Sequence, residues 1–564
     1  MFFRTKKSGP RTYLQIVENH RSGGKIQQRV IATLGRLEEL QASGQLDALL
    51  CSGARFAEAV MLLGAHQNGQ LPAVRTRRIG AALIFERLWR ETGCQAAIAS
   101  LLRERHYEFP VERAVFLTVL HRLVAPGSDR AAERWRRDYA LEGVAGLELH
   151  HLYRAMGWLG EPRSESEQGA ATPFAPRCTK DLIEEELFAR RRDLFTTLEL
   201  VFFDTTSIYF EGTGGESLGQ YGHSKDHRPD LKQMVVGVVI DSDGHPICCE
   251  LWPGNTTDVR TLVPIVERLR RRFGIGEVCL VADRGMISSL TLEELEKRHW
   301  GYILGARLRS QKEISEEVLS RGGRYHVVHP KGRHAKDPSP LQVKEVAVED
   351  RRYIVCLNED QRRKEAADRE AIVGALREQL SRGDKSLIGN KGYRKYLKTQ
   401  GQRFAIDEQK ISEETRYDGK WVLRTNTDLP TAEVALKYKQ LWMVEEIFRS
   451  AKSLLETRPI FHKCDDTIRG HVFCSFFALV LRKALQERLV GSIDPFEWAH
   501  VIADLEALEE VEVYHQGKHF LLRSETKGTC GKVFQAVGVA LPPPSARSGR
   551  SHRHPLTDPR SPHP

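Results

Sequence analysis

Hydrophobic residues along this chain follow two patterns, one typical of strands and one typical of helices. Short runs of aromatic and β-branched residues, such as Val201–Phe210 (VFFDTTSIYF) and Val278–Ala282, predict buried central strands. Between Thr431 and Glu456 the apolar residues recur mostly at steps of three and four, which predicts one long helix. From Leu198 onward the two kinds of segment follow a regular order, so we expect a sheet with attached helices.

The order of these segments indicates a particular fold. The first strand spans 200–210, and the turn pair Asp243-Gly244 joins the second and third strands into a hairpin. Three antiparallel strands followed by strands that alternate with helices is the order of a ribonuclease-H-like fold. The remaining expected elements are strands 234–240, 246–252, 278–282 and 301–308 and helices at about 258–273 and 291–298.

A long charged segment separates the fifth strand from the long helix. It contains four strand-like runs and an amphipathic helix at 361–380, so a structureless loop is excluded and a mostly β insertion domain is expected. The expected class is a multidomain α+β protein with a ribonuclease-H-like core, this insertion, and a preceding helical region. The expected divisions are a small basic β unit at 1–40, a helical region at 41–160, a linker and lead-in helix at 161–195, the core at 196–308 and 425–500, the insertion at 309–424, a C-terminal region at 501–540, and a disordered tail at 541–564.

Three acids stand out against this pattern. Asp204 lies inside the first strand, where a lone carboxylate is costly to bury unless it is paired or holds a metal; a turn-capping Asp is the alternative. Asp283 ends a short parallel-type strand, which is where open α/β sheets bind ligands. Tyr438, Glu445 and Lys452 are seven residues apart and share one helix face, although a half-buried face with a solvent-reaching lysine has the same spacing.

Motifs around these acids resemble those of a known family. The helix is similar to the Y-x2-R-x3-E-x6-K signature of DDE transposases of bacterial insertion sequences, in the insertion-sequence-four-like group, with Leu441 in place of the Arg. That departure affects any DNA contact assigned to the Arg and leaves the acid unaffected. The resemblance covers about Leu198 to Leu489 and includes, in order, Tyr221–Gln233 (YGHSKDHRPDLKQ), Glu250–Asp258 (ELWPGNTTD), Asp418–Asn426 (DGKWVLRTN) and Arg458–His471 (RPIFHKCDDTIRGH).

The resemblance implies a cut-and-paste transposase, which cleaves DNA at the element ends and joins the freed 3′-hydroxyl to target DNA. Carboxylates from two strands and a helix suit two Mg²⁺ or Mn²⁺ ions, with Asp204 bridging both, Asp283 binding one and Glu445 the other. Tyr438 and Lys452 are expected to hold the phosphate backbone near the cut. The resemblance also implies that the helical region at 41–160 is a DNA-binding region that binds the element ends. Further DNA contacts are expected from His223, Lys225, Arg228, Lys232 and Arg284, and from Arg134 and Arg137, for which a solvated basic helix face is the alternative.

Composition agrees with a DNA-binding enzyme. Lys and Arg number 85 against 75 Asp and Glu, which gives a net charge of +10 and favours a polyanionic partner. The expected partners are double-stranded DNA, at the terminal inverted repeats and the target, and a second copy of the chain on that DNA. Two other functions stay open: a metal-dependent nuclease of the same fold that does not join strands, and a catalytically inactive DNA-binding regulator. The presence of all three acids argues against the second.

Cysteine spacing and hydropathy exclude other classes. The ten cysteines form no C-x2-C pair or Cys/His cluster, so neither a zinc site nor a disulfide framework is expected. The N-terminus lacks the apolar core of a signal peptide, and the longest apolar run, Val472–Leu481, is too short to span a membrane. We therefore expect a cytoplasmic, nucleoid-associated protein.

Overall fold

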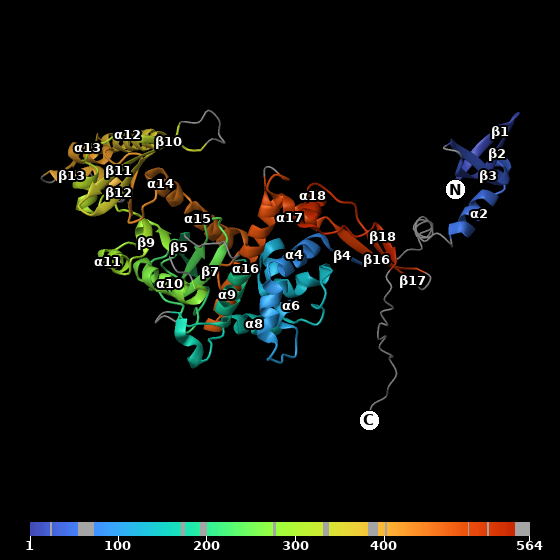
Figure 1. Ribbon diagram of the computed structural model, residues 1–564, viewed down its shortest axis with the longest axis horizontal. Coiled ribbons are helices and arrows are strands. Elements are labelled where there is room, and N and C mark those ends of the chain that lie inside the picture. Colours follow the sequence, from blue (N-terminus) through green and yellow to red (C-terminus); the bar gives the residue numbers. More distant parts are fainter. Residues whose placement is uncertain are drawn as a thin grey trace, which may run out of the picture. The chain divides into compact units, whose positions relative to one another are not determined.

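The chain forms two compact units in a computed structural model (Figure 1). One comprises Met1–Ala81, Asp138–Ala140 and Glu497–Pro564, and the other Ala82–Arg137 and Leu141–Phe496. The structure describes residues 1–22, 25–54, 73–170, 175–191, 200–274, 278–330, 338–381, 393–400, 403–493, 496–515 and 518–547.

The first unit contains two antiparallel sheets. The first has the order β1-β2-β3 and is followed in the chain by two short helices; the second has the order β18-β17-β16-β4, which joins strands from both ends of the chain. The elements are β1 (Phe2–Ser8), β2 (Arg11–Ser22), β3 (Lys25–Arg36), α1 (Leu37–Ala42), α2 (Gln45–Ala54), β4 (Ala73–Arg78), α17 (Trp498–Glu506), β16 (Glu509–His515), β17 (Lys518–Arg523), α18 (Cys530–Val537) and β18 (Ser545–Arg547).

Two sequence predictions for this unit are wrong. Residues 73–78, inside the region predicted to be helical, form β4 because they pair with β16. Residues 545–547, inside the predicted disordered tail, form β18 because they pair with β17. Both strands depend on partners far away in sequence. Residues 55–72, in the region predicted to be helical, and the tail beyond 547 lie outside the described residues.

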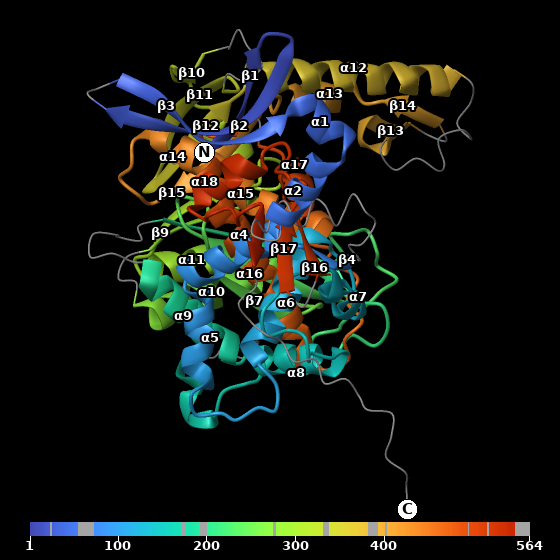
Figure 2. The same cartoon turned by 90° about the vertical axis from the view of Figure 1, so that its right-hand side faces the viewer.

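Helices form the first part of the second unit. The apolar helix α16 (Asp465–Leu489) packs against α6 and α8, and also contacts strand β7 (Figure 2). Two short 3-10 turns, η1 (Arg136–Asp138) and η2 (Glu165–Ala170), lie between the helices. The helices are α4 (Gly80–Glu91), α5 (Cys94–Leu102), α6 (Val111–Val124), α7 (Asp129–Trp135), α8 (Leu149–Gly160) and α9 (Thr179–Arg191).

A nine-stranded sheet is the centre of this unit. Five neighbouring strands have the order β7-β6-β5-β8-β9. The pairs β5–β8 and β8–β9 are parallel, and the pairs β5–β6 and β6–β7 are antiparallel. All eight residues of β6 are buried, as expected for a central strand covered on both faces. The elements are β5 (Leu200–Tyr209), β6 (Gln233–Ile240), β7 (Pro246–Pro253), α10 (Asp258–Phe273), β8 (Cys279–Ala282), η3 (Arg284–Met286), α11 (Ser289–Lys297) and β9 (Gly301–Gly305).

The segment predicted as an insertion continues the same sheet. Its strands extend the sheet beyond β9 in the order β15-β12-β11-β10, all antiparallel. The four predicted strand runs and the predicted helix are present, together with an additional hairpin and a short helix. The elements are η4 (Glu313–Val318), β10 (His326–His329), β11 (Leu341–Val348), β12 (Arg351–Leu357), α12 (Glu359–Ser381), η6 (Tyr393–Tyr396), β13 (Leu397–Gln400), β14 (Arg403–Ile406), α13 (Glu408–Thr415) and β15 (Lys420–Thr425).

A buried ion network connects α9, α10 and β7. Arg272 has no exposed side-chain surface, and its guanidinium lies 2.5 Å from Glu184 and 3.0 Å from Glu250. Buried charges are tolerated when they are paired in this way, so the network fixes α10 against the sheet. Its members are Lys180, Asp181, Glu184, Glu250, Arg268 and Arg272.

Candidate active site

Asp204 lies in the middle of β5, with its carboxylate half-buried. The backbone N–H of Thr205 donates to Oδ1 at 2.7 Å. Burial raises the pKa of Asp204 to about 6; the charges of Asp283 and Asp258 act in the same direction, and Lys225 opposes them. Strand β5 therefore holds an acid whose charge is opposed by burial and by two nearby carboxylates.

Asp283 follows the last residue of β8 and is exposed. Because Phe203 and Ala282 are partners in the parallel β5–β8 pair, Asp204 and Asp283 are the next residue on each of two adjacent strands. The Tyr438 hydroxyl donates to Asp283 Oδ1 at 2.8 Å. Burial, followed by the charge of Asp283, raises the pKa of Tyr438, which therefore stays a hydrogen-bond donor.

The long helix predicted from Thr431 to Glu456 is interrupted, which corrects the sequence prediction. It consists of α14 (Thr431–Lys439), α15 (Trp442–Arg449) and a π-helical turn, η7 (Ser450–Leu454). Tyr438, Glu445 and Lys452 thus lie on three successive segments. The apolar spacing continues through the break at Gln440 and Leu441, so the sequence pattern did not reveal it.

Glu445 lies in the first turn of α15, which packs against β5 and β6. Its side chain is exposed and has no hydrogen bond or ion pair within the described part of the chain. Glu446, by contrast, pairs with Arg449 at 3.0 Å and with Arg482 at 3.7 Å. Among the described residues, the carboxylate oxygens of Asp204, Asp283 and Glu445 do not all lie within 4.8 Å of one another.

A fourth carboxylate lies beside Asp204, and sequence reasoning missed it. Asp258, the first residue of α10, accepts a hydrogen bond from Thr205 Oγ1 at 2.7 Å and pairs with Lys225 at 3.1 Å. Lys225 Nζ also donates to the Thr205 carbonyl oxygen at 2.7 Å. Asp258 ends the motif ELWPGNTTD, and that motif was the available signal. Lys225, predicted to contact DNA, is held by this group.

Lys452 is also held by an acid. Its Nζ lies 2.8 Å from Asp226 Oδ1, and Arg458 lies 2.5 Å from the same oxygen. Burial lowers the pKa of Lys452, and the ion pair with Asp226 opposes that shift. Asp226 is only 5% exposed, and its second carboxylate oxygen is buried without a hydrogen-bond partner. A cation predicted to bind phosphate is therefore bound within the protein.

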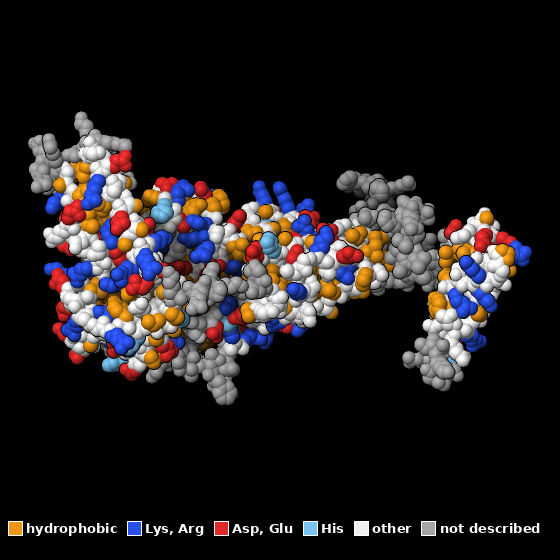
Figure 3. All heavy atoms as spheres, turned by 90° about the horizontal axis from the view of Figure 1, so that it is seen from above, with side chains coloured by type: hydrophobic (Ala, Val, Ile, Leu, Met, Phe, Trp, Pro, Cys, Tyr) orange, Lys and Arg blue, Asp and Glu red, His pale blue; other side chains and the backbone are white. Residues whose placement is uncertain are grey.

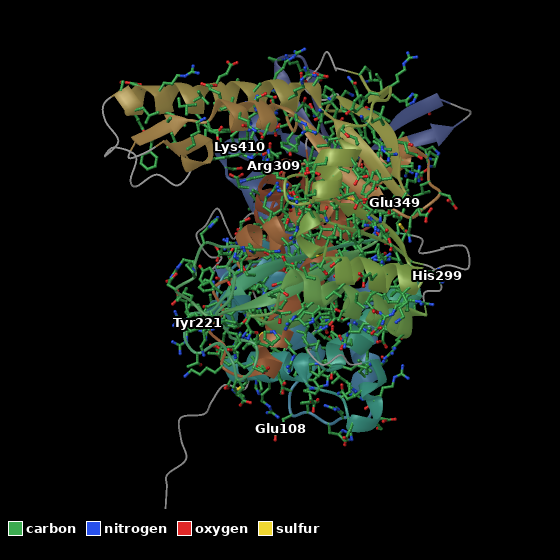
Figure 4. All side chains as sticks on the ribbon, turned by 90° about the vertical axis from the view of Figure 1, so that its left-hand side faces the viewer. Glu108, Tyr221, His299, Arg309, Glu349 and Lys410 are labelled. Carbon is green, nitrogen blue, oxygen red and sulfur yellow. The ribbon has the colours of Figure 1, made fainter. Side chains whose placement is uncertain are left out.

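The other predicted DNA contacts are distributed along the surface. Arg228 pairs with Asp230 at 2.8 Å and lies over the Tyr209 ring. Tyr221, which begins the same loop, lies at the surface in Figure 4 and is 62% exposed. Four of the remaining residues are exposed, namely His223, Arg284, Arg134 and Arg137, and Lys232 is partly exposed. Arg134 lies on α7 and Arg137 on η1, both far in sequence from the β5–β8 edge.

Two groups of side chains elsewhere have the spacing of metal ligands. The first group consists of Asp129, His462 and His471. The Arg122 guanidinium lies 2.8 Å from His471 Nδ1, so a cation already contacts the ring nitrogen that a metal would need. In Asp241, Asp243 and His245, the Asp241 carboxylate accepts backbone hydrogen bonds of its own turn. No described helix is long and apolar enough to cross a membrane.

Comparison with known proteins gives two family matches. Residues 196–481 match the transposase DDE domain, and residues 3–66 match the N-terminal domain of IS1634 family transposases. No curated protein matches the chain.

Solved structures give weaker similarities. A piggyBac transposase synaptic complex with hairpin DNA is 11% identical, with 76% of this chain and 79% of that chain covered and a TM-score of 0.36. A Mos1 transposase paired-end complex with the left transposon end is 14% identical, with 35% and 61% covered and a TM-score of 0.14. A Mos1 mariner paired-end complex with Mn is 15% identical, with 46% and 76% covered and a TM-score of 0.14. These scores are too low to carry an argument about this chain.

Proposed function

Because the chain belongs to the DDE transposase family, whose domain spans residues 196–481, we propose that Asp204, Asp283 and Glu445 are its three catalytic acids. The observation that carries the proposal is that Asp204 and Asp283 each follow a residue of the same pair, Phe203 and Ala282, in the adjacent parallel strands β5 and β8. The packing of α15 against β5, together with the unpaired, exposed carboxylate of Glu445 within the described residues, supports the third assignment.

The order of the central strands supports a ribonuclease-H-like core. In β7-β6-β5-β8-β9 an antiparallel hairpin flanks one side of β5, and two parallel strands that alternate with helices flank the other. Residues 309–424 are then an insertion that extends the sheet from β9. This arrangement supports the proposal that two strand acids and one helix acid, far apart in sequence, belong to one site.

The side chains suit a hard divalent cation. Every proposed ligand atom is a carboxylate oxygen, the ligand type that Mg²⁺ and Mn²⁺ prefer, and the three acids include no His or Cys. We propose two ions, with Asp204 shared, Asp283 on one and Glu445 on the other. When bound, the ions would activate a water or a 3′-hydroxyl and stabilise the leaving oxygen.

Other residues have supporting roles in the proposed site. The Thr205 N–H orients one oxygen of Asp204, and the Tyr438 hydroxyl orients one oxygen of Asp283. Lys225 places positive charge close to Asp204, and Lys452 pairs with Asp226 of the same loop. DNA phosphates would compete with Asp258 and Asp226 for these two lysines. The substrate is double-stranded DNA at the element ends and target, bound by two copies of the chain.

Strand joining separates this function from that of a nuclease of the same fold. The assay uses a labelled duplex that ends in the inverted repeat flanking the gene, already cut to expose its 3′-hydroxyl, with a supercoiled target plasmid and Mg²⁺. Transfer of label to the plasmid is the expected result. Cleavage of uncut ends without such transfer would identify a nuclease, and binding without cleavage would identify a DNA-binding regulator.

A further inference from the structure

The N-terminal sheet has one face that is rich in positive charge. Glu18 is the only acid in residues 2–36, against Arg4, Lys6, Lys7, Arg11, Arg21, Lys25, Arg29 and Arg36. Figure 3 shows Lys and Arg side chains grouped on this N-terminal part, at the right of the picture. The strand register decides which of these charges share a face.

Directly opposed residues in a sheet point to the same side. Arg4 is opposite Gln15, Lys6 is opposite Tyr13, and Arg11 is two residues before Tyr13 on β2. Glu18 lies between Val17 and Asn19, on the other side of β2, and Arg29 approaches it to 3.8 Å. The face with Arg4, Lys6 and Arg11, which we call the basic face, therefore has no acid on its three strands.

Neutral hydrogen bonds hold the centre of the basic face in place. Arg4 donates to Gln15 and to Gln28, each at 2.9 Å, and Gln15 donates to Thr33 at 3.0 Å. Because both acceptors are amide oxygens, they fix the guanidinium without neutralising its charge. Hydrogen bonds from Arg36 and Arg11 lower the pKa of Tyr13, which confirms that those side chains converge on this face. Arg36 is partly neutralised by Glu39 at 2.7 Å.

The outer cations of the basic face are free to bind a ligand. Lys6 and Arg11 are exposed, and neither has an acidic partner within the described part of the chain. A flat surface with fixed positive charge, flexible cations at its edge, and amide groups beside them matches the phosphates and groove edges of duplex DNA. The same surface is mostly polar, apart from Phe2 and Val30 at one end, which are 42% and 43% exposed.

We propose that the basic face of the β1–β3 sheet binds duplex DNA, with Lys6 and Arg11 on phosphates and Arg4 as a fixed charge between them. The inference rests on the proposed function, since it assigns part of the DNA contact to a region separate from the catalytic domain. It gives the basic N-terminal β unit a role that the three catalytic acids do not explain.

Two adjacent lysines provide a matched test. Lys6 is on the basic face, whereas Lys7, opposite Thr12, is on the other face; both are exposed and carry the same charge. Lys6→Gln and Lys7→Gln are made in the full chain, checked by circular dichroism, and titrated into a short fluorescent duplex that carries the flanking inverted repeat. Affinity is measured at several salt concentrations.

Loss of one phosphate contact lowers the slope of log affinity against log salt by about 0.9, which at 0.1 M salt is about an eightfold loss. We expect this change for Lys6→Gln, a similar change for Arg11→Gln, and parental values for Lys7→Gln. Equal behaviour of Lys6→Gln and Lys7→Gln would overturn the inference. If the parent protein cuts the duplex while these variants bind alike, the proposed function stands and only the basic face is wrong. A parent protein that neither binds nor cuts would remove the proposed function itself.

Discussion

Lys452 Nζ and Asp226 Oδ1 lie 2.8 Å apart, so a lysine predicted to contact DNA is bound to an acid of the loop between β5 and β6. The neighbouring Lys225 binds Asp258 and Thr205. Two adjacent residues of opposite charge thus connect α10 and β5 to η7, which continues the helix that carries Glu445. We infer that this loop sets the position of the helix acid relative to the strand acids.

Asp226→Asn should destabilise the protein and slow cleavage. The change leaves Lys452 and Arg458, both mostly buried, without their shared anion, and we expect a loss of about 1–3 kcal/mol in the free energy of unfolding. DNA affinity should rise, because two cations are no longer neutralised. Denaturant titration, DNA titration and cleavage at saturating DNA measure the three effects.

Asp230→Asn is the matched control for that variant. Asp230 is in the same loop and pairs with Arg228, but the pair is exposed, so its loss should leave the stability close to that of the parent. If the two variants lose the same stability, the Asp226 ion pair does not have the positioning role described above.

Asp204→Asn should stabilise the metal-free protein at neutral pH. The folded-state pKa of Asp204 is about 6, above the ordinary value of 3.8, so the folded chain holds this proton more tightly than the unfolded chain. Stability is therefore lost as the pH rises through this range. The variant should exceed the parent by about 1–3 kcal/mol at pH 7.5 in EDTA, and the difference should vanish near pH 4. A variant that is no more stable than the parent at pH 7.5 would contradict the burial cost assigned to Asp204.

Arg272→Met should test the buried ion network. Removing this cation leaves Glu184 and Glu250 with one partner fewer in a buried position, and we expect a loss of about 3–5 kcal/mol in denaturant titration. Arg271→Met, a change of the exposed neighbour on the same helix, should alter stability by less than about 0.5 kcal/mol. If Arg272→Met and Arg271→Met lose the same stability, the buried ion network contributes little to the free energy of unfolding.

Local patterns in the sequence predicted the elements that carry the site. The bounds predicted for α10, Asp258 to Phe273, are those observed, because an amphipathic run begins after a polar turn and ends at Gly274. The strands that bear Asp204 and precede Asp283 were likewise found where apolar β-branched runs placed them. In such segments local preference and tertiary structure agree.

Features that depend on contacts between distant residues were not predicted. The role of Asp258 depends on β5 packing beside the start of α10. The ion pairs of Lys225 and Lys452 depend on how the loop between β5 and β6 lies against α10 and η7. The strand β4 exists because β16, more than 400 residues later, supplies its partner. Periodicity within one segment contains no information about such partners.

The central claim is that Asp204, Asp283 and Glu445 form the metal-dependent catalytic site, and Glu445 and its neighbour test it most directly. The measurement is Mg²⁺-dependent cleavage of a duplex that carries the flanking inverted repeat, with EDTA as the metal-free control and circular dichroism as the folding check. Glu445→Gln removes the negative charge of a proposed metal ligand and should reduce the cleavage rate at least about a thousandfold. A reduction of this size corresponds to losing several kcal/mol of the transition-state stabilisation that the metal supplies. Glu446→Gln breaks a partly exposed pair with Arg449 and should leave the rate within about threefold of the parent. An inactive Glu446→Gln beside an active Glu445→Gln would contradict the account.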